Sequence, residues 1–445
     1  MTELEAMVLV PRPRTIEARA EGAPVGTPVT KRPDPGLPVQ GFRLTIADQR
    51  VHIDHRDDLG LRYAEQLLGQ ITAQAADGHL PGVRIDDAPD VLHRGFMLDI
   101  SRDRVPTRAT LERLVELCAL ARYTQLQLYM EHTFTYRDHG VVWHDASPMT
   151  PAHLTWLDDL CADHGIELVP NQNCFGHMAR WLAHPEYRDR AECPDGWELM
   201  PGVVLPPSVL APRPGNAAFA LGLLDELLPF FRSRQVNIGC DEPFELGHGA
   251  SAEIVADQGR GPVYVDHVAR LAEPLADRGY TVQIWADVLR HHPDLAGQLP
   301  AGTIPVAWCY EAAPPDGPVP LPRTIAEVME RLGTDETAFA GFGPQVAPLA
   351  QADVPFWVAA GTSSWSSLVG RIDNARANLL DAAETARAHG CEGYLVTDWG
   401  DNGHHQPPSV SFAPLVYGGA VAWGVDANRD LPLATVLDRH VFGDA

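Results

Sequence analysis

The sequence lacks long hydrophobic runs and paired-cysteine motifs, and both absences narrow the class of protein. No stretch approaches the roughly 18 consecutive apolar residues that a membrane-spanning helix requires. The first residues, MTELEAMVLVPRPR, place acids ahead of a very short apolar run and so lack the layout of a signal peptide. The seven cysteines have no CxxC spacing, which in a 445-residue chain indicates reduced thiols in packing roles. We therefore expect a cytoplasmic protein without a disulfide framework.

Positive charge is scarce, because 34 lysine and arginine residues stand against 59 aspartate and glutamate residues. The formal net charge of −25 repels polyanions, so we expect neither nucleic acid nor an anionic membrane as a partner. A neutral or cationic small molecule is the better candidate ligand. The sequence leaves the oligomeric state open, a homodimer included.

Nucleotide-binding motifs are missing as well. No GxGxxG or Walker sequence follows any apolar run that we interpret as a strand. We expect no cofactor and no metal ion.

A small α+β domain is expected over residues 1–90. Residues 20–40 are rich in proline and glycine and predict a loop. Apolar residues alternate over 42–46 and again over 51–53, which predicts a hairpin. Residues 61–71 then show helical spacing of leucine, alanine and isoleucine.

Residues 91–445 show a different pattern, in which short apolar runs alternate with amphipathic helices. Such alternation predicts a parallel sheet, and eight units match a (β/α)8 TIM barrel better than an open sheet of five or six strands. Two helix starts carry clear signals, with Thr107 after Pro106 and Thr150 before Pro151. The eight runs are RGFMLDIS, TQLQLYME, IELVPNQN, QVNIGCDE, YTVQIWAD, TIPVAWCY, FWVAAGTSS and GYLVTDWG.

Polar and aromatic side chains gather at the carboxyl ends of these runs. In a barrel these ends all meet at one mouth, which is where the chemistry is expected. Aromatic rings pack against the apolar faces of a sugar while acids and amides bind its hydroxyl groups, so we expect a carbohydrate site. The residues are Asp99, Arg102, Glu131, Asn171, Asn173, His177, Asp241, Glu242, Trp285, Asp287, Trp308, Tyr310, Trp365, Trp399 and Asp401, with Arg94 at the start of the first run.

Two adjacent acids, Asp241 and Glu242, end the fourth run in VNIGCDEPFELG. Burying two like charges side by side is costly unless they have a function. Most glycosidases place two carboxylates on opposite sides of the scissile bond, which neighbouring residues cannot easily do, and the seventh run offers no acid as a nucleophile. Substrate-assisted hydrolysis removes this contradiction, because the 2-acetamido oxygen of an N-acetylhexosamine attacks its own anomeric carbon.

Four stretches resemble motifs of the family 20 glycoside hydrolases, which are β-N-acetylhexosaminidases built on this barrel. NIGCDE is similar to their His/Asn-x-Gly-Gly-Asp-Glu motif, with Cys240 in place of the second glycine. HRGFMLDISR resembles their first-strand Arg-Gly-x-x-x-Asp-x-x-Arg motif, and NQNCFGHM their third-strand Gly-His segment. TDWGDNG is similar to their last-strand Trp-x-Glu, with Asp for Glu. The likeness covers about residues 42–425 and includes the small domain.

The resemblance implies a role for each matching residue. Glu242 would be the general acid/base, and Asp241 would orient the acetamido group. Family members usually supply an acetamido-binding tyrosine from the seventh-strand region, where this chain has Trp365, so we nominate Tyr310 of the sixth run for that role. The implied activity is that of a retaining exo-β-N-acetylhexosaminidase, which removes terminal β-GlcNAc or β-GalNAc through an oxazolinium intermediate. The residues implied to bind or support the sugar are Arg94, Glu131, Asn173, His177, Trp285, Trp308, Trp365, Trp399 and Asp401.

Two other classes of function are weighed against this one. A sugar-binding barrel without catalysis would be expected to have lost the acid, yet Glu242 is present. A metal-dependent barrel hydrolase is less favoured, although 19 histidines are present and GHHQ follows the last run. Such enzymes usually carry His-x-His on the first strand, and RGFMLDIS has none.

Overall fold

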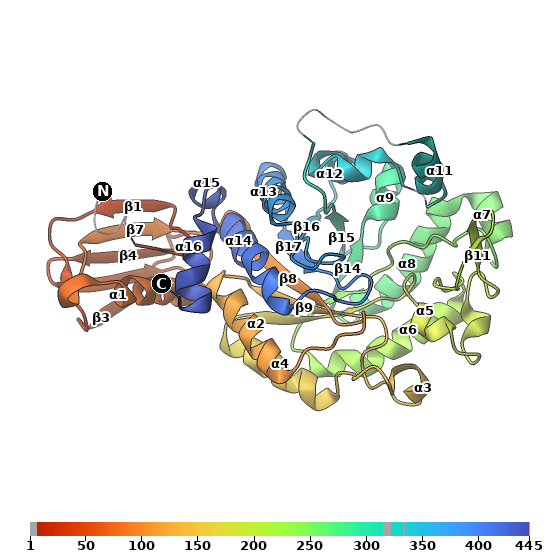
Figure 1. Cartoon of the computed structure of the whole chain (residues 1–445), viewed down its shortest axis with the longest axis horizontal. Coiled ribbons are helices and arrows are strands. Elements are labelled where there is room, and N and C mark those ends of the chain that lie inside the picture. The colour runs from red at the N-terminus through yellow and green to blue at the C-terminus, as the bar shows by residue number, and fades with distance from the viewer. Residues whose placement is uncertain (1–6, 315–321, 333, 445) are drawn as a thin grey trace.

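The computed structural model describes residues 7–314, 322–332 and 334–444. A small domain of sheet and helix lies at one end of the molecule, and a closed eight-stranded barrel forms the rest (Figure 1). The predicted fold class, a TIM barrel preceded by a small α+β domain, is therefore confirmed. Within the described ranges, no helix combines the length and the apolar character needed to cross a bilayer.

The small domain forms because its strands alternate buried apolar and more exposed residues. Leu44 and Ile46 are buried in one strand, and Ile53 of the next strand pairs with Leu44. The helix packs Leu67 and Ile71 against this face. The sheet order is β1-β7-β4-β5-β3. The elements are β1 Thr15–Ala18, β3 Val29–Pro33, β4 Phe42–Ala47, β5 Arg50–His55, α1 Asp58–Ala73 and β7 Val83–Asp87.

The expectation of a loop over residues 20–40 is wrong in part. Strand β3 pairs in parallel with β5 at the edge of the sheet, and a short strand β2 (Ala23–Pro24) pairs with β6 (His79–Leu80). Four of the five residues of β3 are exposed, so the strand shows none of the alternation that would have predicted it. Backbone hydrogen bonds to β5, and not burial of side chains, hold this edge strand in place.

All eight predicted barrel strands are present, and consecutive strands of the barrel are hydrogen-bonded neighbours in parallel pairs. The last strand closes on the first through six residue pairs. The carboxyl ends of the strands therefore surround one mouth. The strands are β8 His93–Asp99, β9 Gln125–Met130, β10 Glu167–Gln172, β13 Gln235–Asn237, β14 Thr281–Trp285, β15 Thr303–Trp308, β16 Trp357–Gly361 and β17 Gly393–Asp398.

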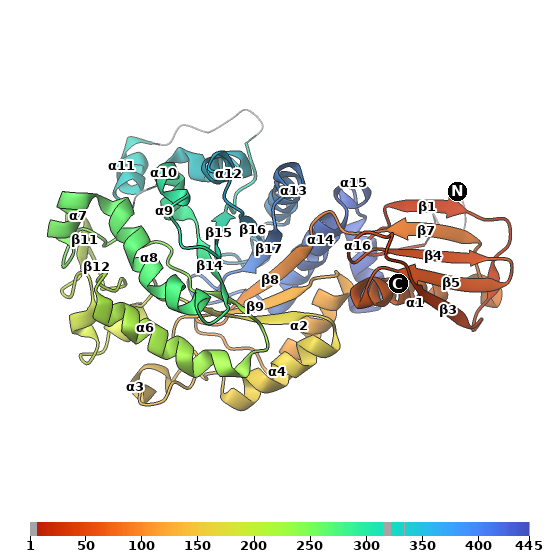
Figure 2. The same ribbon diagram turned by 180° about the vertical axis from the view of Figure 1, so that it is seen from behind.

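Helices surround the barrel, and α6 and α8 run along its outer side in Figure 2. The two predicted helix starts are confirmed, since the side chain of Thr107 accepts from Thr110 N and that of Thr150 accepts from His153 N. The longer helices are α2 Arg108–Leu120, α4 Pro151–Asp163, α6 Pro214–Leu227, α8 Arg260–Ala276, α11 Arg323–Arg331, α12 Phe342–Gln351, α13 Ile372–His389 and α14 Phe412–Trp423. Shorter elements are α3 Gly140–Trp143, α5 Ala179–Leu182, β11 Trp197–Met200, β12 Val203–Leu205, α7 Ala252–Gln258, α9 Asp287–His291, α10 Pro293–Ala296, α15 Val425–Asn428 and α16 Leu433–Leu437.

Buried charged residues fix the small domain to the amino ends of the barrel strands. Nη1 of Arg122 donates to Oδ2 of Asp87 at 3.0 Å, and both side chains are fully buried. The guanidinium lies 4.2 Å from the ring centre of Trp423, whose Nε1 donates to the same carboxylate oxygen at 2.9 Å. Near the end of the chain, the ring nitrogen Nε2 of His440 lies 2.7 Å from the carbonyl oxygen of Val8, which precedes the small domain's sheet. The last helices therefore pack beside the small domain (Figure 1).

Candidate active site

A cavity of about 160 Å³, called here the sugar pocket, lies at the carboxyl ends of the barrel strands. Most of the predicted site residues line it together, although they come from five different strand ends. One further lining residue, Arg102, was not among those expected to bind the sugar. The lining residues are Arg102, His177, Asp241, Glu242, Trp285, Trp308, Tyr310, Trp399 and Asp401.

The loop that carries the acid pair has an unusual backbone. Gly239, Cys240 and Glu242 have φ angles of 69°, 67° and 48°, all in the left-handed region that costs energy for residues other than glycine. Side chains from neighbouring loops hold this conformation. Oδ1 of Asn173 accepts the N–H of Cys240 at 3.1 Å, and Oδ2 of Asp287 accepts the N–H of Glu242 at 3.0 Å. The left-handed angle at Cys240 explains why glycine is the usual residue at this position of the motif.

Asp241 is held rigidly in the ionised state. Its Oδ1 accepts from Nδ2 of Asn173 at 2.7 Å, and its Oδ2 lies 3.2 Å from Nε2 of His177. Burial alone would raise the pKa of this carboxyl, but the charge and hydrogen bond of His177, together with the Asn173 amide, lower the pKa of Asp241 below its usual value. The pocket therefore presents a fixed negative charge that can accept a hydrogen bond from a ligand.

His177 connects the two acids. Its Nε2 lies 3.2 Å from Asp241 and 3.4 Å from Oε2 of Glu242, and its Nδ1 lies 3.7 Å from Oε1 of Glu131. Burial opposes the charged ring, yet the carboxylates of Asp241 and Glu242 outweigh it and raise the pKa of His177 well above its usual value. Close approach is needed here, because a Cβ on Gly176 would come within 2.2 Å of the carbonyl oxygen of Asp241. The imidazolium stabilises the two carboxylates next to each other.

Glu242 is the more accessible acid of the pair. The exposed fraction of its side chain is 35%, against 9% for the side chain of Asp241. A carboxyl that reaches into the pocket while its backbone is fixed can deliver a proton to a ligand and take one from water.

Asp287 is a residue of the site to which the sequence assigned no role. It begins α9, and besides the bond to Glu242 N its second oxygen, Oδ1, is buried without a hydrogen-bond partner among the described residues. Burial first, and then the negative charge of Asp241, raise the pKa of Asp287 to about 7. Its position after the fifth strand was visible in the sequence, but its contact with the Glu242 backbone was not.

The expectation that Arg94 binds the sugar is wrong. Arg94 is fully buried at the amino end of β8, where it donates to the carbonyl oxygens of Val91 and Arg122 and to Oε1 of Gln40. The sugar pocket lies at the opposite end of the same strand. The second residue of a seven-residue strand cannot reach the mouth, because each residue advances about 3.3 Å.

Arg102 is the arginine that reaches the pocket. It forms ion pairs with Asp99 at 2.8 Å and with Glu131 at 3.1 Å. Its guanidinium also lies 4.9 Å from the ring centre of Tyr129 and 5.4 Å from that of Trp399. These contacts fix the direction of the guanidinium, and Arg102 lines the pocket.

Three predicted residues support the pocket without lining it. Glu131 lies behind Arg102 and accepts from the hydroxyl of Tyr129 at 3.0 Å, and Asn173 positions Asp241 as described above. Trp365 places its ring edge-on against Tyr310, with 5.2 Å between ring centroids. They act on a ligand only through the residues that they contact.

Aromatic rings form one side of the pocket. Trp308 stacks on Tyr310, with 5.2 Å between the ring centroids and 17° between the ring planes. The ring centroids of Trp285 and Trp399 lie 5.8 Å apart. Nε1 of Trp285 is buried and has no acceptor among the described residues. Asp401 faces the same cavity, and burial raises its pKa while Arg102 opposes that rise. Apolar faces beside fixed acceptors and donors suit a single sugar ring.

Comparison with known proteins agrees with this architecture. Residues 10–88 match the model of glycosyl hydrolase family 20, domain 2. A β-N-acetylhexosaminidase of Cellulomonas fimi is 26% identical over 300 residues, which are 62% of this chain and 59% of that protein. Hexosaminidase D of Homo sapiens is 26% identical over 173 residues, which are 37% of this chain and 34% of that protein. The chain thus spans less than two thirds of the length of either relative.

Solved structures resemble the chain over nearly its whole length. A β-N-acetylhexosaminidase from Bacteroides fragilis has a TM-score of 0.69 at 15% identity, with 98% of this chain and 95% of that chain covered. An exo-β-N-acetylglucosaminidase from Vibrio harveyi, solved with N-acetylglucosamine, has a TM-score of 0.65 at 14% identity and covers 96% of this chain and 77% of that chain. These likenesses show the same fold.

Proposed function

The chain belongs to glycoside hydrolase family 20, and from this premise we propose that it is a retaining exo-β-N-acetylhexosaminidase that uses substrate assistance. It would remove a terminal β-linked GlcNAc or GalNAc from an oligosaccharide or glycoconjugate. The observation that carries the proposal is the paired geometry of Asp241 and Glu242. One acid is clamped and ionised, and its neighbour is accessible in the same pocket.

A conventional pair of carboxylates is not available from the seventh strand. The residues after β16, Thr362 to Arg371, contain no acid, so no side chain there can serve as the nucleophile. The acetamido oxygen of the substrate supplies that function instead.

In the first step, Glu242 protonates the glycosidic oxygen as the bond to the anomeric carbon breaks. The acetamido oxygen attacks that carbon and closes an oxazolinium ring. Asp241 accepts the acetamido N–H and balances the positive charge that develops there, while the hydroxyl of Tyr310 donates to the acetamido oxygen. The leaving group departs with the proton from Glu242.

In the second step, Glu242 acts as a base. It removes a proton from water, which attacks the anomeric carbon and opens the ring, so the sugar is released with its configuration retained. The imidazolium of His177 keeps Asp241 and Glu242 together through both steps. Trp285, Trp308 and Trp399 exclude water around the sugar ring.

A comparison of three aryl glycosides tests the mechanism. Aryl β-GlcNAc and β-GalNAc should be hydrolysed, aryl β-glucoside should not, and a thiazoline mimic of the oxazoline should inhibit. Equal turnover of the β-glucoside, which has no acetamido group, would exclude substrate assistance. Binding of GlcNAc without turnover of any substrate would instead support a non-catalytic sugar-binding barrel.

The cytoplasmic location and a homodimer stay predictions. Cell fractionation and a measurement of molecular mass in solution would check them.

A further inference from the structure

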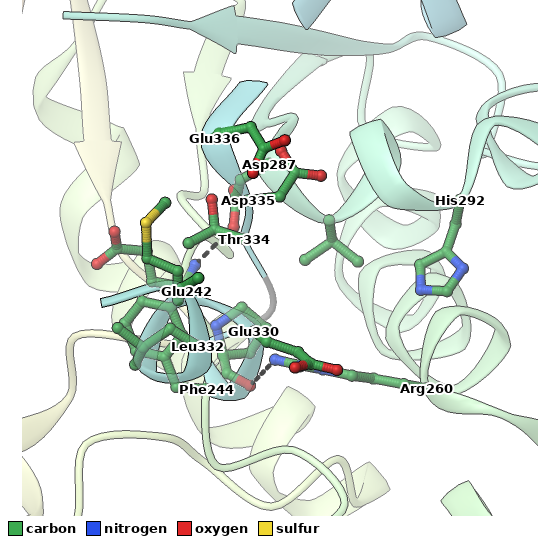
Figure 3. A pocket seen from close by; sticks show the side chains of 14 residues that line it. Glu242, Phe244, Arg260, Asp287, His292, Glu330, Leu332, Thr334, Asp335 and Glu336 are labelled. Carbon is green, nitrogen blue, oxygen red and sulfur yellow. Dashed lines mark hydrogen bonds between the residues drawn. The ribbon is translucent and has the colours of Figure 1, made fainter. Parts of the chain in front are cut away.

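A second and larger cavity adjoins the sugar pocket at Glu242. Its volume is about 430 Å³, against about 160 Å³ for the sugar pocket, and Glu242 lines both. We call it the outer cavity. Its walls come from the loop after β13, the starts of α8 and α9, and α11 with the residues that follow it (Figure 3).

The position of Glu242 defines what can occupy the outer cavity. An acid that protonates a glycosidic oxygen touches an atom bonded to both the terminal sugar and the leaving group. With the terminal sugar in the sugar pocket, the leaving group begins at Glu242. The outer cavity starts at the same residue and has the larger volume.

The inner wall of the outer cavity holds polar atoms that have no partner within the protein. Oδ1 of Asp287 and Nε of Arg260 are buried without hydrogen-bond partners among the described residues. Nη2 of Arg260 donates to the carbonyl oxygen of Pro243 at 2.9 Å, which holds the guanidinium in place. A sugar hydroxyl can accept from Arg260 and donate to Asp287, and the half-buried ring of Phe244 offers a face for the sugar ring.

The charge around the outer cavity is predominantly negative. Exposed Glu330, Asp335 and Glu336 line it together with Glu242, and Asp287 is partly ionised near neutral pH because its pKa is about 7. Two guanidinium groups oppose these acids: Arg260 lines the cavity, and Arg290 interacts electrostatically with Asp287 and Asp335. His292 adds little positive charge near neutral pH, because burial lowers its pKa. A cationic group is therefore attracted to this cavity and an anionic one is repelled.

We propose that the outer cavity binds the leaving group of the substrate, and that this group is a sugar ring with a free amine. The preferred substrate would then be an oligosaccharide in which a terminal N-acetylhexosamine is β-linked to an amine-bearing hexosamine. The proposal rests on the proposed function, and its chemistry is the same hydrolysis. The amine-bearing sugar leaves with the proton that Glu242 donates.

Three disaccharides with the same terminal β-GlcNAc test this assignment. Their leaving sugars are glucosamine, N-acetylglucosamine and glucuronic acid, which carry a positive, a zero and a negative charge. We expect kcat/KM to fall in that order at low salt, with about a tenfold difference between the first and the last, and the difference to shrink at about 0.5 M salt. Equal kcat/KM for all three would overturn the proposal.

A paired substitution locates the effect in the outer cavity. The Glu330→Gln/Glu336→Gln variant should lower kcat/KM for the glucosamine disaccharide about threefold to tenfold and so reduce its advantage over the N-acetylglucosamine and glucuronic acid disaccharides. Glu327→Gln is the matched control, because Glu327 is exposed on the same helix but does not line the cavity. A variant that keeps the wild-type ratio between glucosamine and glucuronic acid would overturn the assignment.

The aryl substrate separates the two proposals. If aryl β-GlcNAc is not hydrolysed at all, the proposed function fails. If it is hydrolysed and the three disaccharides show no charge preference, only the inference about the outer cavity fails.

Discussion

Charged side chains are buried at both ends of the barrel, but they serve different purposes. At the amino end, Arg94 directs its donors to protein acceptors, and Arg122 pairs with Asp87 inside the junction with the small domain. At the carboxyl end, Oδ1 of Asp287 and Nε1 of Trp285 have no partner among the described residues. Nη2 of Arg122 is also buried without a partner among the described residues, but Arg122 lies inside the junction, whereas Asp287 and Trp285 line cavities at the mouth of the barrel.

Left-handed backbone angles occur at both ends, since Gln40 and Arg122 near the junction each have a φ of 60°. Around the acid pair, Cys240 and Glu242 adopt left-handed angles, and His177 does so as well with a φ of 55°. Such strain persists only where surrounding contacts enforce it, and it concentrates at functional sites. Substitutions at the amino end should therefore lower stability without changing the activity of the folded protein, whereas substitutions at the carboxyl end should lower activity and can raise stability.

Glu242→Gln should have the largest effect on activity. The amide cannot protonate the glycosidic oxygen, so kcat on oligosaccharides should fall by about 10²- to 10⁴-fold, while the melting temperature stays near that of the wild type. Steady-state kinetics and thermal unfolding measure the two quantities. Glu253→Gln, an exposed acid on α7, is the control and should keep full activity. Near-normal turnover by Glu242→Gln would remove Glu242 as the acid.

Arg122→Met should lower the stability of the protein and leave its activity unchanged. It leaves Asp87 buried without its cationic partner, so the free energy of unfolding should fall by about 3–5 kcal/mol. Activity per folded molecule should not change. Denaturant unfolding checks this, with Arg323→Met as the control, because the exposed pair of Arg323 and Glu327 contributes less than about 1 kcal/mol. A loss of kcat without a loss of stability would contradict the division between the two ends.

Asp287→Asn should change how stability depends on pH. The pKa of Asp287 is about 7 in the folded protein against an ordinary value of 3.8, so between these values the folded state holds a proton that the unfolded chain releases. The free energy of unfolding of the wild type therefore falls as pH rises from about 4 to 7. Asparagine cannot ionise, yet its side-chain oxygen can still accept the N–H of Glu242.

We expect the Asp287→Asn variant to be more stable than the wild type above pH 7, by at least about 1 kcal/mol, and similar to it near pH 4. Denaturant unfolding across this pH range is the measurement. Asp294→Asn, which changes an exposed acid in the neighbouring helix α10, should show no such pH-dependent gain. A difference that is the same at every pH would contradict the raised pKa.

Trp365→Phe should have the smallest effect. Trp365 does not line the sugar pocket and contacts it only through the edge-on packing against Tyr310. We expect kcat/KM for aryl β-GlcNAc to fall about twofold to fivefold, in line with the energy of one aromatic pair. Trp399→Phe, at a residue that does line the pocket, is the comparison and should lose more.

The barrel strands and the acid pair could be predicted from the sequence because each signal is local. An apolar run ending in polar residues identifies a strand and its carboxyl end, as in VNIGCDEP. Strand β3 could not be predicted, because pairing with β5 across the small domain forms it and its own residues are mostly exposed.

The details of the site depended on contacts between distant residues. The motif around β8 contains two arginines, and only the length and direction of the strand show that Arg102 and not Arg94 faces the pocket. Asp287 touches the backbone of Glu242, which is 45 residues away in the chain. No periodicity or motif encodes such a contact, so it became visible only in the folded structure.

Cys240 gives the protein a built-in reporter. Its thiol is completely buried directly before the two acids, and burial raises its pKa well above the usual value. A thiol in this state reacts with an alkylating reagent only when the loop opens. The rate at which Cys240 is labelled would therefore measure how often the acid pair loses its fixed geometry, and a bound ligand in the sugar pocket should slow it.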